Sequence, residues 1–419
     1  MAGQTIIQKI FESHSPAGTD VTPGNIIWLD LDIRSARDFA GANVVKNYRA
    51  HYGDAPVADK AKTCFTFDLV VPPSNIPYAN NQQICRIWAR EQGVKVYDVD
   101  AGIGSHVAIE EGLAYPGSTF VGTDSHLNIL GAVGAFGQGM GDQDIAFAFK
   151  AGKTWFEVPP TMKVVIKGDI EPPCTARDLT LAVMGQLGSS GALGRAIEFY
   201  GPAIESLDLP GRITLASQVT EVGGIIGFIP PSEETRFFSK RSDKNLVSGI
   251  YADPDAEYVE TVEVDITGLE PLIACPPSPA NVKPVREVAG RRIDSVFLGS
   301  CTNGRFEDFA AVAEIVKGKQ VAPRVMATAV PATRGVYEQM LRSGVLATLF
   351  DAGFIVSNPG CGGCASGHLG MTGIEQVNIS TSNRNFPGKQ GAGDTYLASP
   401  VTAAWSALAG EIAVPEVQR

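Results

Sequence analysis

The sequence predicts an α/β protein of two or three domains. Short apolar runs that suit buried strands end at Gly or Pro and alternate with stretches of helical periodicity, which is the pattern of α/β folds. The chain has 419 residues, more than one hydrophobic core usually supports. Its 44% hydrophobic and 19% charged residues are typical of a globular enzyme.

Strands are expected at five apolar runs, 94–99, 119–123, 162–168, 295–300 and 354–360. Helices are expected where apolar residues recur every three or four positions, at 81–92, 176–188 and 305–318. Polar residues interrupt the apolar window 396–414, so a buried Ala-rich helix is favoured there over a membrane span. Pro-rich seams predict boundaries near 160 and 285, and hence domains 1–160, 161–285 and 286–419.

The charge and the cysteine count narrow the classes of function. A net charge of −11 without a long run of Lys or Arg makes nucleic acid an unexpected partner. The first residues have neither the apolar stretch of a signal peptide nor the bias of a transit peptide, so we expect a cytoplasmic protein without a membrane anchor. Seven cysteines, an odd number, then indicate metal or cluster ligation rather than disulfides.

Three cysteines lie where predicted strands run into loops. Cys301 is part of G-S-C-T-N-G-R, and Cys361 and Cys364 are part of N-P-G-C-G-G-C, at the strand ends where α/β proteins usually carry their chemistry. A single C-x-x-C also suits a redox pair, half a zinc site or two buried thiols. No second C-x-x-C completes a four-cysteine zinc site, so three clustered thiols are expected. On a cubane cluster they would leave one iron open as a Lewis acid.

Four motifs together resemble the aconitase superfamily. They are G-T-D-S-H at 122–126, G-S-C-T-N-G-R around Cys301, N-P-G-C-x-x-C, and S-T-S-N-R-N-F-x-G at 380–388. The resemblance covers nearly the whole chain and implies a three-domain α/β/α assembly around an iron–sulfur cluster. The length resembles the large subunits of 3-isopropylmalate dehydratase and homoaconitase-type hydro-lyases, in which the swivelling fourth domain is a separate small subunit.

The resemblance also implies roles for individual residues. Cys301, Cys361 and Cys364 would ligate a [4Fe–4S] cluster whose fourth iron binds the hydroxyl and carboxylate of the substrate. Asp124 and His126 match the acid–base pair of the family. Glu221 matches its carboxylate near the iron-bound water, and Asn383 and Arg384 match residues that contact the cluster and the substrate.

The chain departs from the family at its acid–base positions. Asp68 is kept, but Leu69 replaces the histidine that is expected to protonate the leaving hydroxyl. Ser105 occupies a second histidine position, on the substrate side of the site, and His106 follows it. Because a histidine can give and take a proton near neutral pH, we expect His106 to act as the missing acid.

Two further departures are Ser217 in place of an asparagine and Lys389 in place of a carboxylate-binding arginine.

We therefore expect an iron–sulfur hydro-lyase of a hydroxy di- or tricarboxylic acid, nearest to 3-isopropylmalate dehydratase and inactive without its small subunit. A divergent hydratase of a maleate- or methylmalate-type hydroxy acid is an alternative. A third is a cluster-sensing regulator that binds RNA, against which the acidic charge counts.

Overall fold

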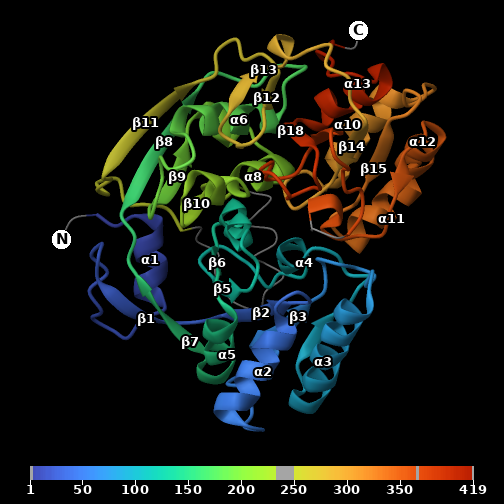
Figure 1. The fold of residues 1–419 in the computed structure, drawn as a ribbon. Coiled ribbons are helices and arrows are strands. Elements are labelled where there is room, and N and C mark those ends of the chain that lie inside the picture. Colours follow the sequence, from blue (N-terminus) through green and yellow to red (C-terminus); the bar gives the residue numbers. More distant parts are fainter. Residues whose placement is uncertain (1–2, 233–249, 365–367, 418–419) are drawn as a thin grey trace.

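Parallel strands with helical connections form three α/β units in the computed structural model, which describes residues 3–232, 250–364 and 368–417 (Figure 1). The predicted α/β class is therefore confirmed. Among these residues, no helix is long and apolar enough to cross a membrane.

The first unit is a five-stranded parallel sheet in the order β4-β3-β2-β5-β6. Its strands are β2 (Ile33–Arg37), β3 (Thr63–Thr66), β4 (Lys95–Tyr97), β5 (Thr119–Gly122) and β6 (Phe136–Gly139). Its helices are α2 (Gly41–Tyr52), α3 (Ile76–Gln92), α4 (Gly104–Glu110) and α5 (Asp142–Ala151), with the 3₁₀ helices η1 (Lys60–Lys62) and η2 (Leu127–Val133). Every residue of β2, β3 and β5 is buried, as expected of parallel strands covered on both faces.

The second unit is a four-stranded parallel sheet in the order β10-β9-β8-β11. Its strands are β8 (Thr161–Lys167), β9 (Ala196–Tyr200), β10 (Ile226–Phe228) and β11 (Glu260–Asp265), and its helices are α6 (Ala176–Leu187), α7 (Pro202–Glu205), α8 (Leu209–Ala216) and η3 (Val219–Val222). Helix α1 (Ile6–Ser13) and an antiparallel pair, β1 (Ile26–Asp30) with β7 (Lys153–Glu157), pack beside these two units.

The third unit is a seven-stranded sheet in the order β13-β12-β18-β17-β14-β15-β16, antiparallel only at β12. Its strands are β12 (Leu272–Ala274), β13 (Val282–Pro284), β14 (Ser295–Leu298), β15 (Met326–Ala329), β16 (Ile355–Val356), β17 (Val377–Ser380) and β18 (Asp394–Ala398). Its helices are α10 (Phe306–Val316), α11 (Arg334–Ser343), α12 (Val345–Asp351) and α13 (Pro400–Ala409), with η4 (Val285–Glu287) and η5 (Gly362–Cys364).

Each of the three units reverses its strand order at one point, and in the second unit β11 returns to the far side of β8. In the first unit the chain winds outward from β2 to β4 and then returns to place β5 on the other side of β2. In the third unit β17 likewise returns to the far side of β14. Ligands of open α/β sheets bind beside the carboxyl ends of strands at such switch points, so the loops after β2, β5, β14 and β17 are the expected place for a site.

Most of the predicted elements are found near their expected bounds. The strands expected at 94–99, 119–123, 162–168 and 295–300 correspond to β4, β5, β8 and β14, while the run at 354–360 forms only the two-residue strand β16. The helix expected from 81 begins earlier, because Asn75 caps it and Pro77 suits its first turn. The window 396–414 holds the end of β18 as well as helix α13.

The predicted boundaries at 160 and 285 stay predictions. The second sheet begins with β8 directly after the first seam, whereas β12 and β13 precede the second seam and pair into the third sheet.

Candidate functional site

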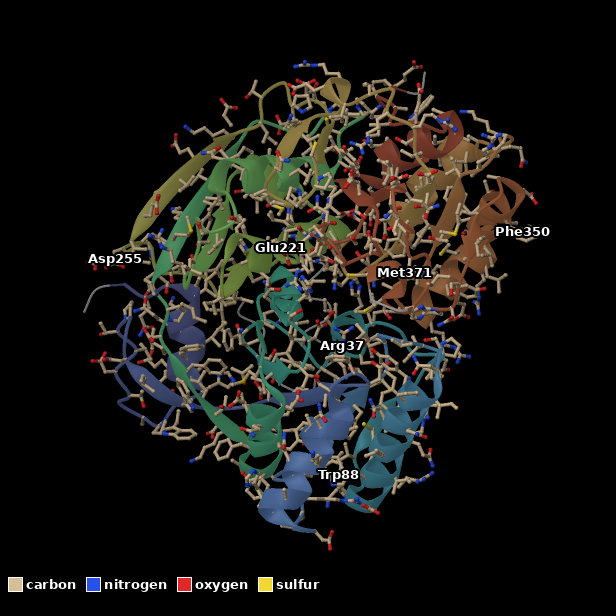
Figure 2. The ribbon with its side chains drawn as sticks, in the orientation of Figure 1. Arg37, Trp88, Glu221, Asp255, Phe350 and Met371 are labelled. Carbon is tan, nitrogen blue, oxygen red and sulfur yellow. The ribbon has the colours of Figure 1, made fainter. Side chains whose placement is uncertain are left out.

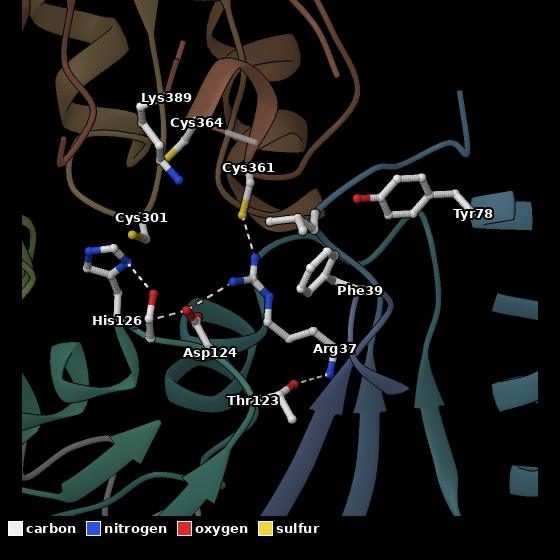
Figure 3. Close-up of a pocket in the computed structure, with 12 residues that line it drawn as sticks. Arg37, Phe39, Tyr78, Thr123, Asp124, His126, Cys301, Cys361, Cys364 and Lys389 are labelled. Atoms are coloured by element: carbon white, nitrogen blue, oxygen red, sulfur yellow. Dashed lines mark hydrogen bonds and ion pairs between the residues drawn. The ribbon is translucent and has the colours of Figure 1, made fainter. Parts of the chain in front are cut away.

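A cavity of about 370 Å³ lies between loops of the first and third units (Figure 3). In Figure 2, Arg37, on the rim of this cavity, and Glu221 lie near the middle of the molecule, whereas Asp255 and Phe350 lie at its edge. The cavity is lined by Arg37, Phe39, Leu69, Tyr78, Thr123, Asp124, Ser125, His126, Cys301, Cys361, Cys364 and Lys389.

The three cysteines of the predicted ligand set line this one cavity. Cys301 follows β14 closely, Cys361 lies on the loop after β16, and Cys364 is the last residue of the 3₁₀ helix η5. Ser300, just before Cys301, has a φ of +78°, an uncommon backbone conformation that is concentrated at functional sites. Gly362 has a φ of +54°, and a Cβ there would lie 2.7 Å from Val330 Cγ2, so this turn between the two cysteines requires glycine.

The arrangement of the thiols bears on what they could hold. Among the residues that the structure describes, no group of three His, Cys, Asp or Glu side chains could hold a metal ion. In a zinc site all ligands converge on one atom. Three thiols spaced around one cavity instead suit a cluster of several irons, because each thiolate of such a cluster can bind a different iron.

Arg37, at the end of β2, connects both sides of the cavity. Its Nε donates to Asp68 Oδ1 at 2.7 Å, its Nη1 to Asp124 Oδ1 at 3.0 Å and its Nη2 to Cys361 Sγ at 2.8 Å. Although burial acts in the opposite direction, the charges of Arg37 and His126 hold the pKa of Asp124 below its usual value. Asp124 is therefore a carboxylate at the cavity wall.

Asp68 lies behind Arg37, outside the cavity lining, and connects it to helix α4. Its Oδ2 accepts a hydrogen bond from Gly104 N at 2.7 Å, at the N-terminus of that helix. Burial raises its pKa to about 7, despite the neighbouring charge of Arg37. Leu69, which follows it, lines the cavity as an apolar side chain.

His126, Glu221 and Arg384 form a chain of hydrogen-bonded side chains, one from each unit. His126 Nε2 lies 2.8 Å from Glu221 Oε1, and Arg384 Nε donates to the same oxygen at 2.6 Å. Burial opposes the charged form of Glu221, but His126 and Arg384 keep its pKa lower than usual. Of the three, only His126 lines the cavity.

The structure does not bring Ser105 and His106 to the cavity. Both are buried in the first turn of α4, and neither is among the residues that line the cavity. His106 Nε2 lies 2.9 Å from the carbonyl oxygen of Cys301, and burial lowers its pKa to about 3. The role of His106 as the acid stays a prediction, and its position favours His126 instead.

Of the other predicted residues, some line the cavity and some lie behind it. Lys389 lines the cavity. Asn383 lies behind it, where its Oδ1 accepts from Cys301 Sγ at 3.3 Å and its Nδ2 donates to Ser217 O at 3.3 Å. Ser217 in turn donates to Thr302 Oγ1 at 3.0 Å, so it stabilises the loop that carries Cys301.

Sequence reasoning missed several cavity residues, of which Arg37 is the most connected. The others are Phe39, Tyr78, Thr123 and Ser125. A signal for Arg37 existed in the run I-R-S-A-R at 33–37, because two arginines in a short β-like run have to be paired if that strand is buried.

Known proteins are similar to this chain over nearly its whole length. The sequence profile of the Aconitase family (aconitate hydratase) matches residues 8–292 and 281–410. The chain is 39% identical over 416 residues to 3-isopropylmalate dehydratase large subunit 1 of Methanopyrus kandleri, covering 99% of both chains. It is 40% identical over 417 residues to the homoaconitase large subunit of Thermus thermophilus, covering 99% of this chain and 98% of that relative. A probable 3-isopropylmalate dehydratase large subunit of Methanothermobacter thermautotrophicus is 40% identical over 415 residues, covering 98% of each.

Proposed function

The chain belongs to the aconitase family, and we propose that it is the large subunit of an iron–sulfur hydro-lyase that acts on a hydroxy di- or tricarboxylic acid, nearest to 3-isopropylmalate dehydratase. The observation that carries this proposal is the position of Cys301, Cys361 and Cys364 on one cavity together with Asp124 and His126.

Cys301, Cys361 and Cys364 would hold a [4Fe–4S] cluster. The donor set suits this group, because three buried thiols line one cavity without converging on a single atom. When bound, such a cluster supplies an open iron that acts as a Lewis acid on a carbon–oxygen bond.

The proton steps of the reaction are assigned to His126. An imidazole can donate and accept a proton near neutral pH, and this ring lies at the cavity wall. Glu221 holds His126 Nε2 at 2.8 Å and is itself held by Arg384, so the orientation of the ring is fixed from behind. A histidine supported by a carboxylate in this way is a common acid–base arrangement.

The carboxylates of the substrate are assigned to Lys389. Its ammonium lines the cavity opposite Arg37 and Asp124, where it can attract one carboxylate as a point charge. The nearby guanidinium of Arg384 is bonded to Glu221, which leaves Lys389 the cation best placed to bind substrate within the part of the chain described.

A second candidate is a hydratase of a smaller hydroxy acid, such as a maleate- or methylmalate-type substrate. It is favoured by Leu69, which makes part of the cavity apolar where the family resemblance leads one to expect a histidine. The two candidates share the cluster and His126 but differ in the group that fills the cavity.

The relatives are named large subunits, so the test uses this chain together with a small subunit. The two chains are co-expressed, purified without oxygen and assayed on a panel of malate derivatives, including 3-isopropylmalate, homocitrate and methylmalate. Turnover of a branched or tricarboxylic substrate supports the first candidate, and turnover of methylmalate or maleate alone supports the second. A colourless protein that contains stoichiometric zinc after anaerobic reconstitution would refute both.

A further inference from the structure

We propose that Arg37 is a positioning residue for the cluster. Its guanidinium donates a hydrogen bond to the sulfur of Cys361 and thereby governs how firmly the cluster is held and at what potential it is reduced. This inference rests on the proposed function. It concerns an arginine that the sequence reasoning did not select.

Three nitrogens of Arg37 meet three acceptors from three separate loops. Nε and Nη1 bind the carboxylates of Asp68 and Asp124, which follow β3 and β5, and Nη2 binds Cys361 Sγ at 2.8 Å. The acceptors are 31, 87 and 324 positions away from Arg37 in the sequence. The guanidinium therefore connects the first unit directly to the cysteine loop of the third.

Protein groups other than the sulfur fix the orientation of this guanidinium. The backbone N–H of Arg37 donates to Thr123 Oγ1 at 2.9 Å, and the side chain is only 11% exposed. Asp68 accepts a hydrogen bond from Gly104 N, and Asp124 accepts one from His126 N. Both carboxylates that bind Arg37 are therefore held in place themselves. Nη2 is thus directed at Cys361 by groups other than the sulfur.

The contact with sulfur would persist in the holoprotein. A cysteine sulfur that binds iron retains lone pairs, and an arginine keeps its positive charge at every working pH. Hydrogen bonds to ligand sulfurs change the reduction potential of clusters, and outer partners of this kind hold the ligands in place. A donor with a positive charge stabilises the more negative, reduced state, so Arg37 is expected to raise the potential.

A second use of Arg37, as a clamp for the carboxylate of a substrate, is less consistent with its contacts. Its three nitrogens are already bonded to protein atoms, and its charge lies between two carboxylates. Lys389, across the cavity, lines the same space.

The main test compares Arg37→Lys with Arg34→Lys. Lysine keeps the charge but cannot span three acceptors. Arg34 is a matched control, because it is a buried arginine on the same strand that bonds mainly to backbone carbonyls such as Leu31 O and Asp59 O, away from the cavity. Each variant is reconstituted without oxygen, and its iron and sulfide content, its reduction midpoint by EPR-monitored titration and its thermal unfolding are measured.

In Arg37→Lys we expect cluster affinity to fall roughly 10–100-fold, the usual effect of removing an outer partner of a metal ligand, and the midpoint to shift to a lower potential. Arg34→Lys should match the wild type in both measurements. A folded Arg37→Lys variant with wild-type affinity and wild-type midpoint would overturn the inference.

A second measurement needs no variant at Arg37. Wild-type protein grown with ¹⁵N-labelled arginine is reduced, and pulsed EPR detects nitrogen coupled to the cluster. A ¹⁵N coupling that persists in Arg384→Lys supports the inference, and the absence of coupling in the wild type overturns it. If the wild type binds no cluster at all, the proposed function fails as well, and iron analysis distinguishes that outcome from a failure of the Arg37 contact alone.

Discussion

The cysteines of the cavity and those of the hydrophobic cores differ in their surroundings but hardly in their burial. All seven are free and buried. Burial raises the pKa of Cys301 and Cys361, and it raises the pKa of Cys64 and Cys85 to about 12 as well. Only Cys301, Cys361 and Cys364, however, line the cavity. Burial alone thus does not distinguish the three cysteines of the cavity from the core cysteines, whereas the open space beside the sulfur does.

Two buried carboxyl groups also differ in their surroundings. Glu221 is surrounded by His126 and Arg384, and its pKa is lower than usual even though burial opposes this. Asp178, at the start of α6, bonds mainly to peptide N–H groups and to Thr175, and burial raises its pKa to about 6. The cationic partner and the imidazole beside Glu221 therefore favour its ionised form, whereas burial without such partners favours the neutral form of Asp178.

The largest expected effect separates the two sets of cysteines. Replacing Cys301, Cys361 or Cys364 by Ser should abolish stable cluster binding, because an alcohol is a far poorer ligand for iron than a thiolate. Serine at Cys64, Cys85, Cys174 or Cys275 should leave the cluster in place. Iron and sulfide analysis after anaerobic reconstitution measures the cluster content of each variant. Cluster loss from a variant of the second set would show that the ligand set is wrong.

The next effect separates the two histidines near the cysteines. His126→Asn should lower turnover by roughly 10²–10⁴-fold with the cluster intact, the usual contribution of a positioned acid or base. His106→Asn should cost less, because His106 is buried outside the cavity lining. Steady-state kinetics of the chain co-expressed with a small subunit would measure both, and a greater loss in His106→Asn would indicate that His106 is the acid.

A smaller effect concerns the dependence of stability on pH. Because the folded pKa of Asp178, about 6, exceeds its ordinary value of 3.8, the folded state binds this proton more tightly. The resulting stabilisation is complete below about pH 4 and is lost as the pH rises through about 6. Between about pH 4 and about pH 8, the wild type should therefore lose about 3 kcal/mol of its free energy of unfolding relative to Asp178→Asn. This value corresponds to a pKa difference of about two units.

Urea unfolding of both proteins at the two pH values measures this difference. Asp208→Asn is a control, because Asp208 also caps a helix of the second unit, through Gly211 N. A difference between Asp178→Asn and wild type that does not change with pH would contradict the assignment.

The smallest expected effect concerns a core cysteine. Cys85 is fully buried in the first unit beside Phe65 and Trp88, and a serine hydroxyl there would lose its hydration. We expect Cys85→Ser to lower the free energy of unfolding by about 1–3 kcal/mol without changing cluster content or midpoint. Chemical unfolding and EPR of the same sample check both parts, and a changed midpoint would mean that the core and the cavity are coupled.

Local pattern was sufficient for much of the fold. Strand β8 and helices α6 and α10 lie close to their predicted bounds, because each has a strong apolar period and, for α6, the capping pair Thr175 and Asp178. The family motifs indicated the aconitase-like fold, which the family match confirms. Strand β2 was not predicted, since its two arginines broke the apolar run.

The sequence by itself determined the family, the fold class and the identity of the three candidate ligand cysteines, because these depend on short motifs whose residues are neighbours in the chain. Only the tertiary structure decided which histidine reaches the cavity and that Arg37 reaches Cys361. Residue type alone does not distinguish His106 from His126. The first turn of α4 buries His106, whereas the loop after β5 places His126 at the cavity. Arg37 and Cys361 are 324 positions apart and meet because strand ends of two sheets face one another, an arrangement that no local pattern encodes.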